Sequence, residues 1–167
     1  AAVERIGCPS VLKTRRFGYD GKGQAKIMKP AEARAAYDEI GHAPAILEGF
    51  VKFEREISVI VARGPDGETA AYDPVENIHK NHILDRTLAP AALPKAIADE
   101  ACAIAARIAN ELDYVGVMGV EFFVAGNSLL VNEIAPRVHN SGHWTQAVCI
   151  TDQFENHIRA ICSWPLG

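Results

Sequence analysis

Two glutamates stand within otherwise apolar sequence, and they are the residues of the chain best suited to carry out chemistry. Glu121 belongs to the apolar run Val117–Val124, and Glu133 belongs to the run Leu129–Ile134. Burying a lone carboxylate costs on the order of several kcal/mol, or forces its protonation, unless a cation compensates the charge. Two carboxylates with the amide oxygen of Asn132 would suit Mg²⁺, a hard ion that takes a few carboxylates and then phosphate oxygens. The alternative is that each glutamate lies on a solvated strand edge beside a basic residue.

The element that must position both acids is a β-hairpin. Both runs are rich in β-branched and aromatic residues, and Ala125–Ser128 separates them. A two-residue turn would place Glu121 opposite Asn132, whereas a three-residue loop, Gly126–Ser128, would place Glu121 opposite Glu133. We expect the three-residue loop, because it directs both carboxylates to one face of the hairpin.

The segment after the hairpin is dense in hydrogen-bond donors. Ala135–Thr145 contains Arg137, His139 and His143 together with asparagine and serine. A loop of this composition, directly after two acids, indicates a polyanion site. The net charge of −4 gives no general attraction to nucleic acid or anionic membranes, so phosphate binding must depend on local arrangement.

A second candidate phosphate site lies near the start of the chain. A short strand ends near Lys13, and Arg15–Gln24 then holds three glycines and three basic residues. Glycines let backbone N–H groups approach phosphate oxygens. The Walker A pattern is absent, and a strand-like sequence follows instead of the helix that a dinucleotide-binding GxGxxG motif requires. The alternative is a glycine-rich turn with solvated charges.

Composition limits the class of protein. With 167 residues and 49% hydrophobic content, the chain predicts one domain or two small lobes with an ample core. The four cysteines show neither a Cys-x-x-Cys pair nor metal spacing with histidine, which favours free thiols in a reducing cytosol. No signal peptide or membrane-spanning run is evident.

The remaining pattern predicts an α+β chain rich in antiparallel strands. The expected helices are Lys29–Ile40, Lys95–Leu112 and Asp152–Cys162, and the expected strands besides the hairpin are Pro9–Thr14, Ala25–Lys29, Ala45–Val51, Ile57–Ala62 and Glu68–Tyr72. Ile57–Ala62 lacks alternation, which predicts burial on both faces.

Other segments are less informative or carry a single expectation. Residues 1–9 show no helix or strand pattern, and residues 77–82 are simply polar. The last helix gathers Phe154, Ile158 and Ile161 on one apolar face, and Trp144 and Trp164 are interpreted as packing residues.

Three separated features together resemble the ATP-grasp superfamily: a lysine strand followed by a glycine-rich loop, an acidic strand at Glu48, and a hairpin with acids twelve residues apart. The strings RRFGYDGKGQ, ARGPDGETAAY, YVGVMGVEFF and NEIAPRVHNSGHWT narrow the resemblance to the 5-(carboxyamino)imidazole ribonucleotide synthases, almost from Ser10 to the end. This implies an ATP-grasp fold in which a small lobe, residues 1–50, and a large lobe, residues 51–167, enclose the nucleotide. The family's N-terminal and C-terminal domains are expected to be absent from this chain.

The resemblance also implies a set of nucleotide-binding residues. They are Lys13, Gly18, Tyr19, Asp20, Gly21, Lys22, Gly23, Gln24, Glu48, Gly49, Phe50, Val51, Glu56, His79 and Asn132. Lys13 would contact the phosphates, the loop 18–24 would close over them, and residues 48–51 would form the hinge beside adenine. Glu56 would bind the ribose hydroxyls, and His79 would lie near the nucleotide.

The implied activity is ATP-dependent carboxylation of 5-aminoimidazole ribonucleotide with bicarbonate, through carboxyphosphate, in de novo purine biosynthesis. Glu121 and Glu133 would bind Mg²⁺, with Mn²⁺ as a substitute, and Arg137 and His139 would serve the bicarbonate and carboxyphosphate pocket. His139 could accept the proton of the attacking amine, a hypothesis that a fully active His139→Asn variant would contradict. The resemblance further implies a cytoplasmic enzyme that is a homodimer in its full form, with no nucleic-acid or membrane partner.

Three alternatives stand beside this interpretation. Another ATP-grasp carboxylate–amine ligase, or a biotin-dependent carboxylase, would share the loop and the paired acids. A nucleotide-binding module without catalysis would bind Mg-ATP and release no phosphate. A structural domain without a ligand is disfavoured, because Lys13, Glu121 and Glu133 would then be uncompensated charges in apolar strands.

Overall fold

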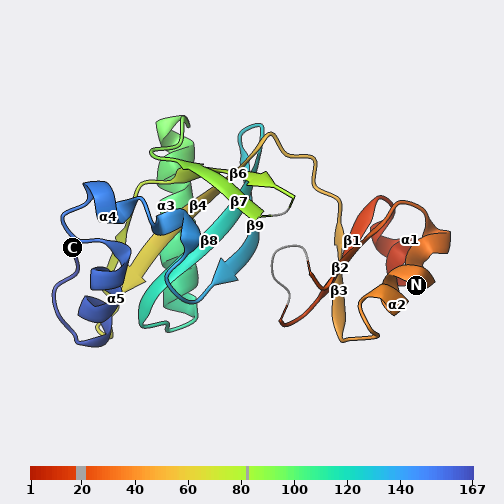
Figure 1. The fold of residues 1–167 in the computed structure, drawn as a ribbon, viewed down its shortest axis with the longest axis horizontal. Coiled ribbons are helices and arrows are strands. Elements are labelled where there is room, and N and C mark those ends of the chain that lie inside the picture. Colours follow the sequence, from red (N-terminus) through yellow and green to blue (C-terminus); the bar gives the residue numbers. More distant parts are fainter. Residues whose placement is uncertain (18–21, 82) are drawn as a thin grey trace. The chain divides into compact units, whose positions relative to one another are not determined.

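The computed structural model describes residues 1–17, 22–81 and 83–167 (Figure 1). Within it the chain divides into two compact units. The first comprises Ala1–Lys52 with Asn81 and Ile83, and the second comprises Phe53–Lys80 and Leu84–Gly167. Among the helices of these described ranges, none has the length and apolarity needed to cross a bilayer.

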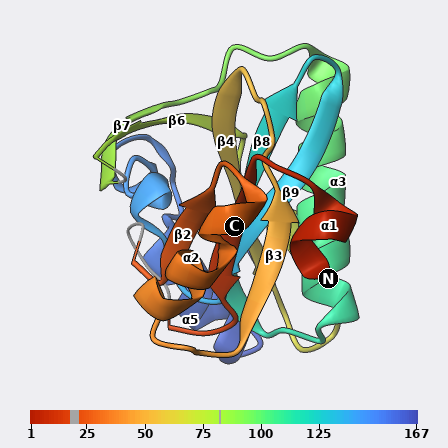
Figure 2. The ribbon, with the colours of Figure 1, turned by 90° about the vertical axis from the view of Figure 1, so that its right-hand side faces the viewer.

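The first unit is a three-stranded antiparallel sheet with two helices on one face (Figure 2). Its elements are α1 (Ala2–Ile6), β1 (Ser10–Thr14), β2 (Gln24–Ile27), η1 (Pro30–Glu32), α2 (Ala33–Glu39) and β3 (Ala45–Gly49), with strand order β2-β1-β3. Ala25, Ile27, Ala36 and Ile40 form the core between sheet and helices. The expectation of no helix in residues 1–9 was wrong. Because α1 has only five residues and none is buried, it leaves no periodic pattern in the sequence.

The second unit is built on a six-stranded sheet. Its elements are β4 (Arg55–Arg63), β5 (Thr69–Ala71), β6 (Val75–Lys80), β7 (Ile83–Leu88, which enters this unit at Leu84), α3 (Lys95–Glu111), β8 (Gly116–Ala125), β9 (Ser128–Ala135), η2 (Asn140–Gly142), α4 (Thr145–Val148) and α5 (Gln153–Ile161). The strand order is β7-β6-β4-β8-β9, and β5 pairs with β4. The polar residues 77–82, to which no element was assigned from the sequence, belong mainly to β6. Periodicity did not reveal that strand, because polar side chains such as Asn77 are buried in it.

The two faces of this sheet are covered differently. On one face, Ile57, Val59 and Val61 of β4 pack with Ala101 and Ala105 of α3, which runs along the sheet (Figure 2). Small alanines at spacing i, i+4 allow the helix to approach the sheet closely. The opposite face carries a smaller cluster around Ile60, Ala62 and Val117, which Tyr72, Val138 and Leu166 cover. The predicted burial of β4 on both faces is therefore confirmed.

The hairpin β8–β9 confirms the expected pairing of acids but not the expected turn. Ala125 pairs with Ser128, so the turn has two residues, and Gly126 adopts φ 59°, which glycine tolerates at the first position of a II′ turn. A two-residue turn alone would place Glu121 opposite Asn132. A β-bulge shifts the register between Glu121 and Phe122, and Glu121 therefore pairs with Glu133.

The apolar face of the last helix is not its buried face. Its buried side chains are those of Gln153, Asn156 and Ala160, whereas Phe154, Ile158 and Ile161 of the predicted apolar face are 37%, 48% and 51% exposed. The buried amides are paired: Asn156 donates to Gly167 O at 2.8 Å, and Gln153 bonds to the backbone of the preceding loop. Specific hydrogen bonds therefore decide which face of α5 is buried. Trp164, interpreted as a packing residue, is 58% exposed.

Candidate functional site

The paired acids lie on the sheet face opposite α3, and they differ in their surroundings. Glu121 is paired with Ser58 of β4 on one side and with Glu133 of β9 on the other, so its side chain is only 15% exposed. Burial raises the pKa of Glu121 from 4.5 to about 7, and the negative charge of Glu133 acts in the same direction. Glu133 is exposed at the outer strand. A buried carboxyl facing a second carboxylate is a site that a cation would stabilise.

The residues present fit a magnesium ion. Asn132 is the extra residue of the bulge, and its side chain hydrogen-bonds to the carboxyl of Glu121. The bulge thus brings two carboxylates and one amide to the same point of the hairpin. Within the described ranges, no group of three or more His, Cys, Asp or Glu side chains could hold a metal ion. Phosphate oxygens and water would have to complete the coordination of a magnesium ion here, as is usual for that ion in nucleotide sites.

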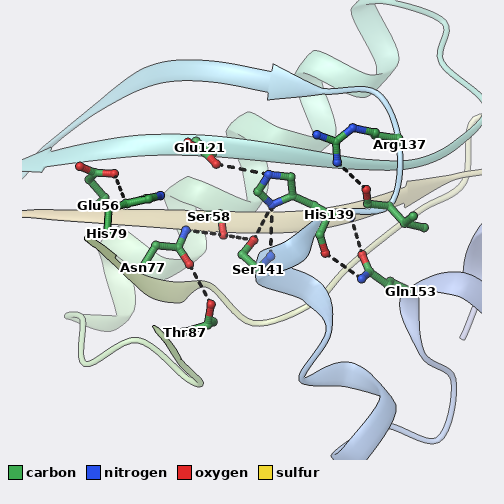
Figure 3. Close-up of polar contacts among 11 residues, drawn as sticks. Glu56, Ser58, Asn77, His79, Thr87, Glu121, Arg137, His139, Ser141 and Gln153 are labelled. Carbon is green, nitrogen blue, oxygen red and sulfur yellow. Dashed lines mark hydrogen bonds and ion pairs between the residues drawn. The ribbon is translucent and has the colours of Figure 1, made fainter. Parts of the chain in front are cut away.

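His139 lies with its imidazole ring between Glu121 and Ser141 (Figure 3). Its Nε2 is 3.3 Å from Oε1 of Glu121, and its Nδ1 is 2.8 Å from Oγ of Ser141. The side chain is only 11% exposed. Burial lowers the pKa of His139 to about 4, and the positive charge of Arg137 acts in the same direction. The ring is therefore held neutral beside the acid.

The backbone of His139 is held by one buried amide side chain. Oε1 of Gln153 accepts from the His139 N–H at 2.9 Å, and Nε2 of Gln153 donates to the His139 carbonyl at 2.8 Å (Figure 3). Gln153 has no exposed surface, and it lies so close to Gly142 that a Cβ there would come within 2.5 Å of its Oε1. The first turn of α5 therefore fixes the backbone of the loop that carries His139.

Glu56 and His79 form a second charged pair on neighbouring strands. Nδ1 of His79 lies 2.8 Å from Oε2 of Glu56, and both side chains are about a quarter exposed. The hydrogen bond to Glu56 raises the pKa of His79, against the effect of burial. The charges of Glu121 and Glu133 act on His79 in the same direction as Glu56, which indicates that these four groups share one electrostatic environment. Arg137 is exposed, and its Nη1 donates to the carbonyl of Val138 at 2.9 Å, which leaves much of its guanidinium facing solvent.

The predicted nucleotide residues of the first unit lie on and beside its sheet. Nζ of Lys13 is 2.8 Å from Oε2 of Glu48, across β1 and β3, so these two charges are paired with each other. Gln24 opens β2 opposite Lys13, and Gly23 accepts from the N–H of Thr14 at 2.7 Å.

The other residues predicted for this part of the site flank these strands. Lys22 precedes β2, whereas Gly18, Tyr19, Asp20 and Gly21 lie outside the described residues. Gly49 ends β3, and Phe50 and Val51 follow it. The N–H of Phe50 donates to Pro9 O at 3.1 Å, so that backbone group is already used.

Several residues that support the site were not predicted from the sequence. They are Ser58, Asn77, Thr87 and Gln153; Ser141 was counted among the polar residues of the loop 135–145, but no role was assigned to it. Ser58 left one signal, because it is the only polar residue in the otherwise apolar run Ile57–Ala62 of β4. Gln153 left none, since its position at the start of α5 is typical of an exposed residue.

Comparison with known proteins identifies relatives over nearly the whole chain. A family model for the ATP-grasp domain matches residues 1–154. The N5-carboxyaminoimidazole ribonucleotide synthase of Brucella melitensis is 52% identical over 170 residues, which cover 100% of this chain and 47% of that protein. The protein of the same name from Bacillus subtilis is 48% identical over 167 residues, 99% of this chain and 44% of that protein. The chain thus spans about half the length of the curated relatives it matches.

Solved structures agree with these relatives. The N5-carboxyaminoimidazole ribonucleotide synthetase of Thermus thermophilus matches with a TM-score of 0.90 and 49% identity, covering 99% of this chain and 45% of that one. The Aspergillus clavatus synthase, solved in complex with ADP and 5-aminoimidazole ribonucleotide, matches with a TM-score of 0.90 and 32% identity over 99% of this chain and 43% of that one.

Proposed function

The chain belongs to the ATP-grasp family, and from this premise we propose that it is the nucleotide-binding portion of a 5-(carboxyamino)imidazole ribonucleotide synthase. The proposed reaction consumes ATP, bicarbonate and 5-aminoimidazole ribonucleotide and yields the N5-carboxylated ribonucleotide, ADP and phosphate. The observation that carries the proposal is the bulged hairpin. It sets Glu121 opposite Glu133, beside a loop that presents Arg137 and His139.

The proposed chemistry needs charge neutralisation more than covalent help. An oxygen of bicarbonate attacks the γ-phosphorus of ATP and ADP leaves, which produces carboxyphosphate; the exocyclic amine of the ribonucleotide then takes up the carboxyl group and phosphate is released. Phosphoryl transfer of this kind depends on positioning and on stabilising the charge of the phosphoryl oxygens. A magnesium ion held by Glu121 and Glu133 would supply part of that positive charge when bound.

The residues of this chain supply the remainder. Arg137 keeps a largely solvent-facing guanidinium and can pair with a carboxylate or phosphate. Nε2 of His139 lies 3.3 Å from Oε1 of Glu121, next to the place proposed for the metal. Glu56 would accept from ribose hydroxyls, with His79 paired to it at 2.8 Å. Lys13 would exchange its partner Glu48 for nucleotide phosphates.

The nucleotide specificity and the setting are further parts of the proposal. An Aspergillus clavatus relative was solved in complex with ATP and, in another structure, with ADP and 5-aminoimidazole ribonucleotide. These complexes support small-molecule substrates of this class. Four free cysteines support a reducing, cytoplasmic setting. A homodimer is proposed for the full enzyme from the family resemblance alone.

The test is phosphate release from ATP by this chain with Mg²⁺ and bicarbonate, measured with and without 5-aminoimidazole ribonucleotide. Release that depends on the ribonucleotide is expected, and it should be lost in Glu133→Gln, which removes a proposed metal carboxylate. Glu111→Gln, which changes an exposed carboxylate at the end of α3, is the matched control and should retain release.

Mg-ATP binding measured by calorimetry separates the remaining outcomes. Binding without release would reduce the proposal to a nucleotide-binding module. If the chain neither binds Mg-ATP nor releases phosphate, the proposal for this chain is contradicted. Release stimulated by a different amine, and not by the aminoimidazole ribonucleotide, would favour another ATP-grasp carboxylate–amine ligase.

A further inference from the structure

A series of buried and partly buried hydrogen bonds runs from β7 through the sheet to the ring of His139 (Figure 3). Oγ1 of Thr87 donates to Oδ1 of Asn77 at 3.3 Å, and Nδ2 of Asn77 donates to Oγ of Ser58 at 3.0 Å. Oγ of Ser58 lies 2.6 Å from Oγ of Ser141, and that oxygen lies 2.8 Å from Nδ1 of His139. All these residues belong to the second unit, so this series of hydrogen bonds lies within one compact body.

The direction of these bonds follows from groups that can only donate or are already used. The backbone N–H of Ser141 points at Nδ1 of His139 at 3.4 Å, and a backbone N–H cannot accept a hydrogen bond. Nδ1 must then present its lone pair toward Ser141. At the other end, Ser58 accepts from Asn77, so its own proton is available to donate to Ser141. Ser141 in turn donates its hydroxyl proton to Nδ1.

These directions determine which nitrogen of the ring carries the proton. With its lone pair on Nδ1, a neutral imidazole has its proton on Nε2. Nε2 is the nitrogen that lies 3.3 Å from Oε1 of Glu121. The ring therefore presents an N–H donor, and no lone pair, to the point where the acids of the hairpin meet.

We propose that Ser58, Asn77 and Ser141 hold His139 as the Nε2–H tautomer, so that the ring serves the site as a hydrogen-bond donor and not as a base. The functional part of this inference rests on the proposed carboxylase function. A donor at this position would stabilise the oxygens of bicarbonate or carboxyphosphate, which are acceptors. The proton of the attacking amine would then have to leave to another group or to solvent. His139 is the residue in contact with the reacting groups, and the two serines and Asn77 are positioning residues.

Because these hydrogen-bonded residues are buried, disturbing one of them is costly, which supports a positioning role. Ser58 and Ser141 have no exposed surface, and Asn77 is 6% exposed. A single hydroxyl removed from the middle would leave buried donors or acceptors without partners. Ser58 lies 83 residues from Ser141 in the sequence, so the contact depends wholly on the folded sheet.

The test is nitrogen-15 NMR of the histidine rings in the metal-free chain, since long-range proton–nitrogen correlations distinguish a protonated ring nitrogen from one with a free lone pair. The His139 signals are assigned by their loss in His139→Gln. In the wild-type chain, Nδ1 is expected to show the shift of an unprotonated nitrogen and Nε2 that of a protonated one. A protonated Nδ1 in the wild-type chain would overturn the proposal, and this result needs no variant to fold.

Variants then test the role of the hydrogen-bond chain. Ser141→Ala and Ser58→Ala should each convert the single tautomer of His139 into a mixture, whereas Ser128→Ala, at an exposed serine of β9, should leave it unchanged. An unchanged single tautomer in both buried variants would also overturn the proposal.

The NMR result does not depend on catalysis, so it stands whether or not the chain releases phosphate. If the chain is active, Ser141→Ala should lower kcat by up to about 100-fold, the effect of a small misplacement of a catalytic group. KM for ATP should change little, because Ser141 is not among the residues proposed to contact the nucleotide. A full kcat in Ser141→Ala would refute the functional part alone.

Discussion

Folding shifts the pKa values of Glu121 and His139 in opposite directions. In the wild-type chain, their large effects on the pH dependence of stability should therefore nearly cancel. Burial raises the pKa of Glu121 from 4.5 to about 7 and lowers that of His139 from 6.5 to about 4. Because their atoms approach to 3.3 Å, the bound protons belong to the pair. The folded pair holds one proton between about pH 4 and 7, and the unfolded pair holds one between 4.5 and 6.5. The pair therefore adds almost no slope to the free energy of unfolding across this range.

Removing either partner should expose the contribution of the other. In Glu121→Gln, the unfolded chain protonates His139 below pH 6.5 while the folded chain does so only near pH 4. Stability relative to wild type should then fall as pH is lowered across that interval. In His139→Gln, the unfolded chain loses the proton of Glu121 above pH 4.5 while the folded chain keeps it to about pH 7. Relative stability should then fall as pH is raised. At 1.36 kcal/mol per pH unit, each interval corresponds to about 3 kcal/mol.

The assay is urea unfolding of the chain at about pH 4.5, 5.5, 6.5 and 7.5, with a chelator present, compared with wild type at each pH. The chelator matters because a bound cation would stabilise ionised Glu121. Glu111→Gln controls for the loss of an exposed carboxylate. Opposite slopes in the two variants are expected. Free energies that run parallel to wild type across the whole range would refute the reasoning, since neither group would then differ between the folded and unfolded states.

Two further changes test how His139 is held. Gln153→Met keeps the volume of a fully buried side chain but leaves the N–H and carbonyl of His139 unpaired, so urea unfolding should show a loss of about 2–4 kcal/mol. Gln146→Met, at an exposed position of α4, should cost less than about 0.5 kcal/mol, and equal losses would contradict the assignment. Gly119→Ala would set a Cβ 2.9 Å from Cβ of His139, so a cost of about 1–3 kcal/mol and shifted His139 ring signals are expected. Gly49→Ala, whose methyl group would make an ordinary 3.8 Å contact, should leave those signals unchanged, and an unmoved spectrum in both variants would disprove the close approach.

Local pattern was sufficient for most of the elements and for the acids. The run of β4 without alternation, the alanine spacing of α3 and the break between β8 and β9 each depend on residues close in sequence. The isolated carboxylates Glu121 and Glu133 were informative for the same reason, since a charge in an apolar strand needs compensation wherever it lies. The long string around Arg137 and His139 was specific enough to indicate the family.

The details of the site could not be derived in this way. The pairing of Glu121 with Glu133 was expected from a three-residue loop, but a two-residue turn and a bulge produce it. A three-residue loop and a two-residue turn with a bulge each shift the pairing of Glu121 by one residue, from Asn132 to Glu133. Sequence spacing therefore cannot distinguish them.

The burial of α5 and the tautomer of His139 depend on distant partners. The apolar side chains of α5 would favour burial of their own face, but the bonds of Gln153 and Asn156 turn the polar face inward. The proton of His139 depends on Ser58 and Asn77, which come from other strands of the sheet. The sequence by itself therefore determined the kinds of element, the charged groups and the family. Only the tertiary structure decided register, buried face and proton position, because each of these depends on hydrogen bonds between residues far apart in the chain.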